Sequence, residues 1–149
     1  NEVLCYCGKQ GCLETEASGN DLLRMFKEKL ASGLASSINI NPKNIQLEDI
    51  IKAVNQDDTL AIETLADMAD NLGRGIALLI NIFNPELIVI GGSLAATGDY
   101  LRLPIRSAIN KYSLSLVNVD TKIQISHLGE KSGVIGACLL SRNRVFNIA

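Results

Sequence analysis

Three cysteines near the start of the chain are the residues best suited to chemistry. Cys5, Cys7 and Cys12 lie in the stretch Cys-Tyr-Cys-Gly-Lys-Gln-Gly-Cys, where Gly8 and Gly11 permit the turns that would aim the thiols at one point. Grouped thiolates are preferred zinc ligands. A disulfide or ordinary small-residue packing are the alternatives. We favour metal binding, because a bridge between Cys5 and Cys7 would close a strained ring and three local cysteines leave one unpaired.

A structural zinc site needs four ligands, and this stretch supplies three. The lone histidine, His127, lies far along the chain after a predicted strand, and we favour an ordinary loop residue over a fourth ligand for it. The last cysteine, Cys138, has helical spacing with Ile135 and Leu139, which predicts a position in the core.

The rest of the sequence alternates between predicted helices and strands, which is typical of an α/β domain. Residues 1–19 should form a tight loop. Apolar spacing predicts helices over residues 20–30, 48–54, 58–83, 101–112 and 133–143, and strands over residues 87–90 and 122–126. A loop rich in Ser and Asn is expected over residues 32–44.

The helix predicted over residues 58–83 has one face of large apolar residues and one of small residues around Gly73, which would let a second backbone approach closely. The pattern predicts a central helix that is exposed at first and buried later, and that stops at Asn84-Pro85. The strand over residues 87–90 is apolar throughout and ends at Gly91-Gly92, which predicts burial on both faces.

Composition narrows the possible functions. With 149 residues, 47% hydrophobic and 20% charged, the chain can form one globular domain. The net charge of -2 gives no sign of the basic stripe that nucleic-acid binding requires. The opening lacks a signal peptide's apolar core and no apolar run is long enough to span a membrane. We therefore expect a cytoplasmic protein without a membrane partner.

The order of motifs resembles the ROK family, which groups repressors, uncharacterised reading frames and sugar kinases. The resemblance covers essentially the whole chain and rests on Cys5-x-Cys7-Gly8-x-x-Gly11-Cys12-Leu13-Glu14, on Glu14-x-x-Ala17-Ser18-Gly19, on Asn84-Pro85-Glu86-Leu87-Ile88-Val89-Ile90-Gly91-Gly92, and on Gly133-Val134-Ile135-Gly136-Ala137. It implies the second lobe of an actin-like (ribonuclease H-like) ATPase fold, helix-rich α/β. Residues 1–19 would be the zinc loop and residues 20–149 the α/β lobe. The match argues against an unrelated interaction domain with a zinc staple.

The resemblance also implies roles for individual residues. Glu14 would accept hydrogen bonds from a sugar hydroxyl, since a carboxylate has two accepting oxygens; without the resemblance it would be an ordinary surface glutamate. Gly91 and Gly92 would let backbone amides approach a nucleotide, with a plain strand-ending turn as the alternative. The fourth zinc ligand of the family is a histidine shortly before the first cysteine, and we expect it upstream of this chain.

Two functions remain open. In a transcriptional regulator, this lobe would bind a sugar or sugar phosphate and form a homo-oligomer, with DNA bound only through an absent N-terminal helix-turn-helix. In an ATP-dependent, glucokinase-like sugar kinase, ATP would be the cofactor and upstream residues would do the chemistry, so residues 1–149 alone would be inactive. We favour the regulator, because Ser93 stands where many family kinases have a further glycine and Leu103-Pro104-Ile105 resembles the regulators.

Overall fold

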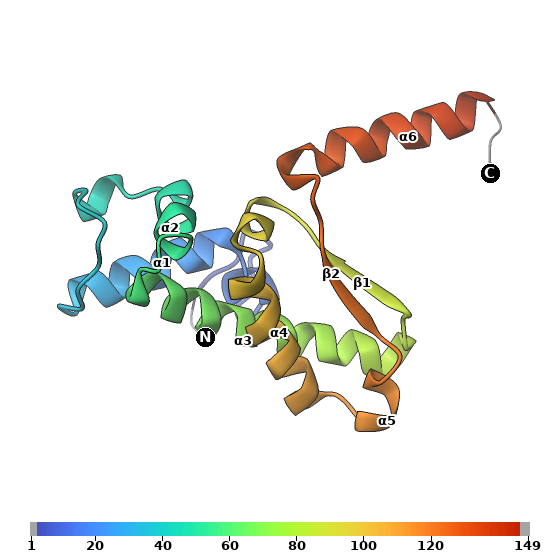
Figure 1. The fold of residues 1–149 in the computed structure, drawn as a ribbon, viewed down its shortest axis with the longest axis horizontal. Coiled ribbons are helices and arrows are strands. Elements are labelled where there is room, and N and C mark those ends of the chain that lie inside the picture. The colour runs from blue at the N-terminus through green and yellow to red at the C-terminus, as the bar shows by residue number, and fades with distance from the viewer. Residues whose placement is uncertain (1–2, 147–149) are drawn as a thin grey trace.

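The computed structural model describes residues 3–146. The longer elements are α1 (Gly19–Ala31), α2 (Leu47–Val54), α3 (Thr59–Phe83), β1 (Leu87–Ile90), α4 (Asp99–Tyr112), α5 (Ser115–Asn118), β2 (Lys122–Ile125) and α6 (Ser132–Phe146). Short 3-10 turns lie at η1 (Leu13–Thr15), η2 (Pro42–Asn44), η3 (Ser93–Thr97) and η4 (Gly129–Lys131). The helices and strands expected from the sequence are confirmed, with small shifts at their ends. Figure 1 shows α3 running through the middle of the molecule.

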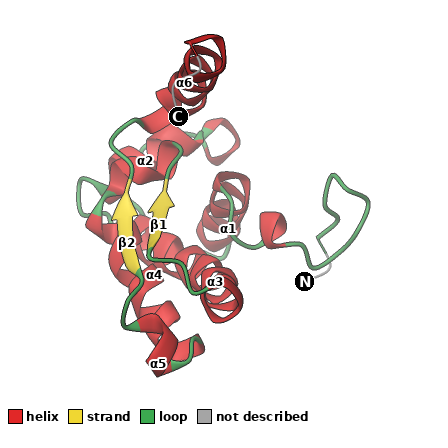
Figure 2. Ribbon diagram, turned by 90° about the vertical axis from the view of Figure 1, so that its right-hand side faces the viewer, coloured by secondary structure: helices red, strands yellow, loops and turns green. Residues whose placement is uncertain are grey.

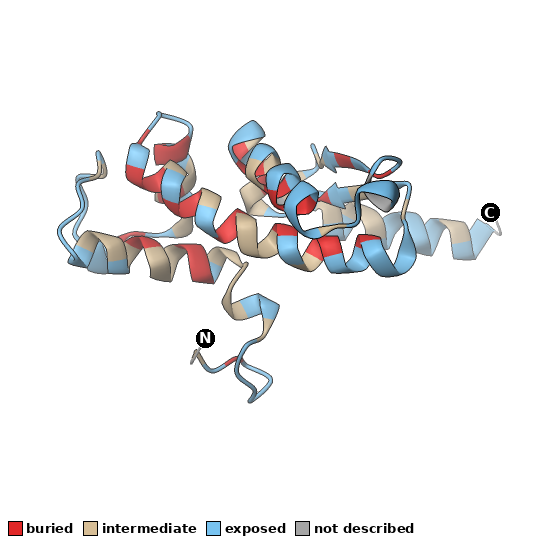
Figure 3. Ribbon diagram, turned by 90° about the horizontal axis from the view of Figure 1, so that it is seen from below, coloured by how far each residue is buried: buried red, intermediate tan, exposed pale blue. Residues whose placement is uncertain are grey.

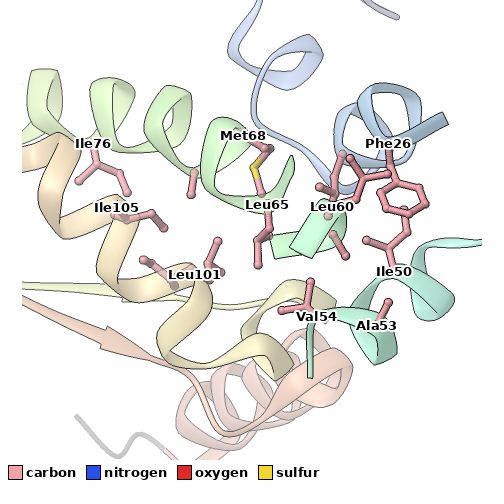
Figure 4. Packing of buried hydrophobic residues seen from close by; sticks show 14 of the residues in the cluster. Phe26, Ile50, Ala53, Val54, Leu60, Leu65, Met68, Ile76, Leu101 and Ile105 are labelled. Atoms are coloured by element: carbon pink, nitrogen blue, oxygen red, sulfur yellow. The ribbon is translucent and has the colours of Figure 1, made fainter. Parts of the chain in front are cut away.

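The first half of α3 is the part that packs most deeply. Buried residues of α1 and α2, among them Phe26, Ile50 and Val54, gather around Leu60 and Leu65 of α3 (Figure 4). The expectation that α3 is exposed at first and buried later is therefore wrong. Its second half contacts α4 along one side and Leu13 of η1 at Gly75, but Leu78, Leu79, Ile82 and Phe83 near its end are exposed.

The small-residue face of α3 meets α4, as the sequence predicts. A Cβ built at Gly73 would lie 2.5 Å from Cβ of Ala108 and 2.9 Å from the carbonyl oxygen of Ile105. Only glycine admits the α4 backbone at this distance. The helix ends at Phe83, where Asn84 caps it in the left-handed conformation and Pro85 follows, so the predicted stop is confirmed.

The sheet consists of β1 and β2, which pair in parallel from Leu87 opposite Lys122 to Ile90 opposite Ile125 (Figure 2). The helix α4 connects the two strands along the chain. Burial of β1 on both faces is not observed. Ile90 is buried, but Leu87 and Val89 are 47% and 57% exposed, because no element of residues 3–146 covers their face of the sheet.

The last helix, α6, extends away from the other elements (Figures 1 and 3). No described residue of α6 is buried, and Cys138 is exposed. The predicted core position of Cys138 is therefore wrong, because helical spacing predicts an apolar face without showing what packs on it. None of the helices within residues 3–146 combines the length and apolar character that crossing a bilayer requires.

We predict that Gly73→Ala destabilises the protein by ~1–3 kcal/mol despite the better helix propensity of alanine, because the new methyl overlaps the α4 backbone. The matched control is Gly136→Ala on α6, where a Cβ meets nothing within 4 Å. That change should be neutral or stabilise the protein by ~0.5–1 kcal/mol. Urea unfolding measures both. Equal effects of the two substitutions would refute the close α3–α4 contact.

We also predict that residues 1–149 self-associate. Large apolar side chains are exposed on the second half of α3, on β1 and on α6, at Leu78, Leu79, Ile82, Phe83, Leu87, Val89, Val134, Leu140, Val145 and Phe146. Exposed patches of this kind usually mark an interface. Sedimentation should show a dimer or larger species that Phe83→Lys weakens and Gln56→Lys, at an exposed position just after α2, does not. A compact monomer over a wide concentration range would contradict this prediction.

Candidate functional site

The cysteine loop, residues 5–12, is a tight turn whose backbone folds back on itself. Leu4 pairs with Gln10 in an antiparallel bridge. The amide of Cys5 donates to the carbonyl of Lys9 at 2.8 Å, and the amide of Gly8 donates to the carbonyl of Cys5 at 2.9 Å. Gly8 has a φ of 81°, in the left-handed region that favours glycine. The local sequence thus folds the chain back on itself and brings its cysteines together.

The three predicted ligands converge. The sulfur atoms of Cys5, Cys7 and Cys12 all lie within 4.8 Å of one another, and the Cys7 and Cys12 sulfurs are 3.4 Å apart. Tetrahedral coordination with metal–sulfur bonds of about 2.3 Å places sulfurs about 3.8 Å apart. The cluster therefore fits one metal ion with small adjustments. His127 is exposed and is not part of this cluster.

The thiols of the loop differ in acidity. The pKa of Cys7 is lowered, first by the Lys9 backbone amide that donates to its sulfur and then by the neighbouring thiols. Hydrogen bonding to Cys7 and Cys5 raises the pKa of Cys12 to about 11. Loss of a proton is therefore favoured at Cys7 and opposed at Cys12 by the neighbouring thiols. A bound cation would remove this opposition, because it favours all the deprotonated ligands together.

Glu14 lies two residues beyond the last cysteine, in the turn η1. Its side chain is exposed and lines a cavity of about 280 Å³ that Cys5, Thr15 and Ser18 also line. The hydroxyl of Thr15 donates to the carbonyl of Cys12 at 2.8 Å, so η1 follows the position of the cysteine loop. The structure thus places the predicted sugar-binding residue in a cavity that one of the predicted metal ligands, Cys5, also lines.

Two residues of α3 hold η1, and sequence reasoning missed both. Leu13 packs on Gly75, where an added Cβ would lie only 2.9 Å from the Leu13 side chain. The side-chain amide of Asn71 donates to the carbonyl of Glu16 at 3.2 Å. A glycine inside a helical pattern was the available signal, because such a residue often marks a close contact.

An ion pair at the start of α1 also lines the Glu14 cavity and was not predicted. Arg24 donates to Asp21 and, at 2.9 Å, to Glu28. Asp21 is buried. Burial raises the pKa of Asp21, and the opposing effect of Arg24 does not cancel it. The Oδ2 atom of Asp21 has no hydrogen-bond partner among the described residues. The cavity therefore combines a buried carboxyl, a guanidinium and the exposed Glu14.

Gly91 and Gly92 line a second cavity, of about 250 Å³, together with Ser18 and Gly19 at the start of α1. Gly92 has a φ of 85°, which favours glycine. Backbone amides at the N-terminus of α1 carry partial positive charge, so this cavity has the chemistry to accept an anionic group. Ser18 lines both cavities, so the start of α1 lies between Glu14 and the two glycines.

Known proteins of one family are similar to this chain over most of its length. The ROK family model matches residues 1–144. A glucokinase of Halalkalibacterium halodurans is 36% identical over 135 residues, which cover 89% of this chain and 41% of that protein. The DNA-binding transcriptional dual regulator NagC of Escherichia coli is 33% identical over 143 residues, covering 96% of this chain and 34% of NagC.

A solved structure confirms the fold. The ROK family glucokinase of Streptomyces griseus, in complex with glucose and AMPPNP, superposes with a TM-score of 0.83 at 28% identity, over 95% of this chain and 47% of that one. This chain spans less than half the length of each of these three proteins. Both kinases and a regulator are thus similar to it. Because the family model spans nearly every residue, this chain belongs to the ROK family.

Proposed function

We propose that this chain is the sugar-binding lobe of a sugar-responsive transcriptional regulator, in which zinc bound by the cysteine loop positions Glu14. The observation that carries the proposal is the placement of Glu14 in a cavity that Cys5, one of the three clustered thiols, also lines. A carboxylate accepts two hydroxyl hydrogen bonds in fixed geometry, which suits the vicinal hydroxyls of a sugar. The similar Streptomyces griseus protein was crystallised with glucose, which supports a hexose as the ligand class.

Zinc is the metal that this donor set favours. Three thiolates make a soft, strongly donating site, and structural zinc sites of this composition are closed by one more ligand. The fourth position is proposed for a donor outside residues 3–146 or for water. Zinc would supply no chemistry to the sugar itself. It would hold Cys12 in place, and Cys12 in turn fixes η1 through Thr15.

The preference for a regulator rests first on the turn after β1. Ser93 begins η3 directly after Gly92, where many kinases of the family have a further glycine. A second feature lies on α4. Leu103 is exposed on α4 and lines an apolar groove of about 260 Å³ with Ile62 and Tyr100. An apolar groove at this position supports homo-oligomer formation, which regulators use to bind paired DNA sites. DNA contact is proposed for a segment outside this chain.

A sugar kinase is the second candidate, favoured by one observation. Gly91 and Gly92 share a cavity with the N-terminus of α1, which is the arrangement that accepts phosphate groups. ATP would be the cofactor in that case. The family resemblance implies that the catalytic aspartate of a kinase lies outside residues 1–149, so we propose that these residues alone transfer no phosphate.

We predict that the purified protein, supplemented with zinc, binds about one zinc ion per chain, measured by elemental analysis after dialysis. Cys7→Ser and Cys12→Ser should each reduce the bound zinc strongly, because each removes one of three clustered thiolates. The control is Cys138→Ser, which removes an exposed thiol outside the cluster and should leave the content unchanged. Zinc content that is low in the parent protein, or insensitive to the loop cysteines, would refute the metal site.

We predict that Glu14→Gln in the full-length protein weakens sugar binding by roughly ten- to a hundredfold, because a hydrogen bond to a charged group contributes about 1.5–3 kcal/mol. Calorimetry with glucose and N-acetylglucosamine measures the affinity. The control is Glu63→Gln, an exposed glutamate of α3 outside the cavity, which should bind as the parent does. Equal affinities of parent and Glu14→Gln would remove Glu14 from the site.

The same full-length protein separates the two candidate functions. A regulator should release operator DNA when the sugar is added and should leave ATP unconsumed. A kinase should convert the sugar to a sugar phosphate in the presence of ATP and magnesium. Sugar phosphorylation by the parent protein, with no sugar-dependent DNA binding, would overturn the regulator in favour of the kinase.

A further inference from the structure

We propose that Cys7 is a site of reversible oxidation by peroxides, and that its oxidation forms a Cys7–Cys12 disulfide and expels the metal ion from the cysteine loop. The inference follows from the different exposure of the three cysteines. Cys7 is exposed and Cys12 half-buried, whereas Cys5 is only 8% exposed. A small oxidant in solvent therefore reaches Cys7 first.

A second thiol lies within reach of the oxidised sulfur. The sulfurs of Cys7 and Cys12 are 3.4 Å apart, so a bond between them requires an approach of little more than an ångström. The intervening turn can absorb this movement. A Cβ added at Gly8 or Gly11 would meet nothing within 4 Å, so there is open space beside the turn at both glycines. Cys5, in contrast, is held by the hydrogen bond from its amide to Lys9.

The chemistry balances with a peroxide as the oxidant. Hydrogen peroxide transfers one oxygen to the Cys7 thiolate, which gives a sulfenic acid and hydroxide. The Cys12 thiolate then attacks the sulfenic sulfur, forms the disulfide and displaces a second hydroxide. Two electrons pass from the two sulfurs to the peroxide, and two protons from solvent convert the hydroxides to water. Two of the three thiolate ligands are consumed, so the metal ion is released.

Oxidation has a consequence for the Glu14 cavity, which rests on the function proposed above. Cys12 accepts the hydrogen bond of Thr15, and Glu14 lies between these two residues in the chain. Movement of Cys12 toward Cys7 therefore shifts η1. We expect the oxidised protein to bind sugar more weakly than the reduced, zinc-loaded form.

Cys138 provides a matched control within the same chain. It is exposed like Cys7, but it is not a member of the thiol cluster. Peroxide can oxidise it to the sulfenic acid and beyond, without a neighbouring thiol to stop the reaction at a disulfide. The proposal therefore predicts different products at two exposed cysteines.

The test is a titration of the zinc-loaded full-length protein with hydrogen peroxide, followed by a chromogenic zinc chelator and by mass spectrometry. Cleavage after Lys9 separates Cys7 from Cys12, so their disulfide joins two peptides. Alkylation before digestion should label Cys5 and leave Cys7 and Cys12 protected. About one zinc ion should be released per disulfide formed, and dithiothreitol with added zinc should restore the starting state. Cys138→Ser should behave as the parent.

Three results would overturn the proposal. The first is that the protein retains zinc while Cys138 alone is oxidised. The second is that zinc is lost but no disulfide forms, and the third is that the disulfide includes Cys5. Because Cys7→Ala is expected to lose zinc by itself, that variant is judged only by alkylation, where Cys12 should remain free after peroxide. Sugar binding is measured separately on the reduced protein. Its absence there would refute the proposed function and leave the oxidation result valid.

Discussion

Glycine at positions 73 and 75 lets α3 make close contact with two different parts of the chain. Residues two apart on a helix point about 200° apart, so these positions lie on nearly opposite sides of α3. At Gly73 the α4 backbone approaches, and α4 leads into the second strand of the sheet. At Gly75 the side chain of Leu13 packs, and Leu13 joins the cysteine loop to Glu14. Both the sheet and the candidate site are thus placed by one helix.

The attachments of the cysteine loop and of η1 explain how a metal ion at the candidate site would position Glu14. The cysteine loop is short and largely exposed, and its backbone bonds are few. A metal ion would supply the rigidity that so small a loop cannot obtain from a core. The Thr15 hydrogen bond passes that rigidity to η1, and Leu13 and Asn71 fix the other side of the same turn to α3. Glu14 is held between these attachments.

The sequence predicts which segments are helix or strand far better than it predicts what covers them. The parallel strands, the helix end at Asn84 and the small-residue contact at Gly73 are all visible in local patterns. Burial is not local. Val89 and Cys138 have the spacing of core residues but lie on surfaces that no part of residues 3–146 covers. Apolar periodicity shows that a face is apolar and does not identify its partner.

Some features of the candidate site can likewise be predicted from local sequence patterns, and others cannot. Cysteine spacing alone predicts the convergence of three thiols, whereas the sequence pattern alone gives Glu14 no special role, and the family resemblance supplied it. The contact of Gly75 with Leu13 joins residues 62 positions apart, which no local rule anticipates.

The proposal that zinc positions Glu14 is tested most directly by the sugar affinity of the full-length protein, measured with zinc bound and after its removal by chelation. We predict a clear loss of affinity in metal-free protein that remains folded by circular dichroism, with recovery when zinc is restored. Equal affinity in the two forms would contradict the proposal.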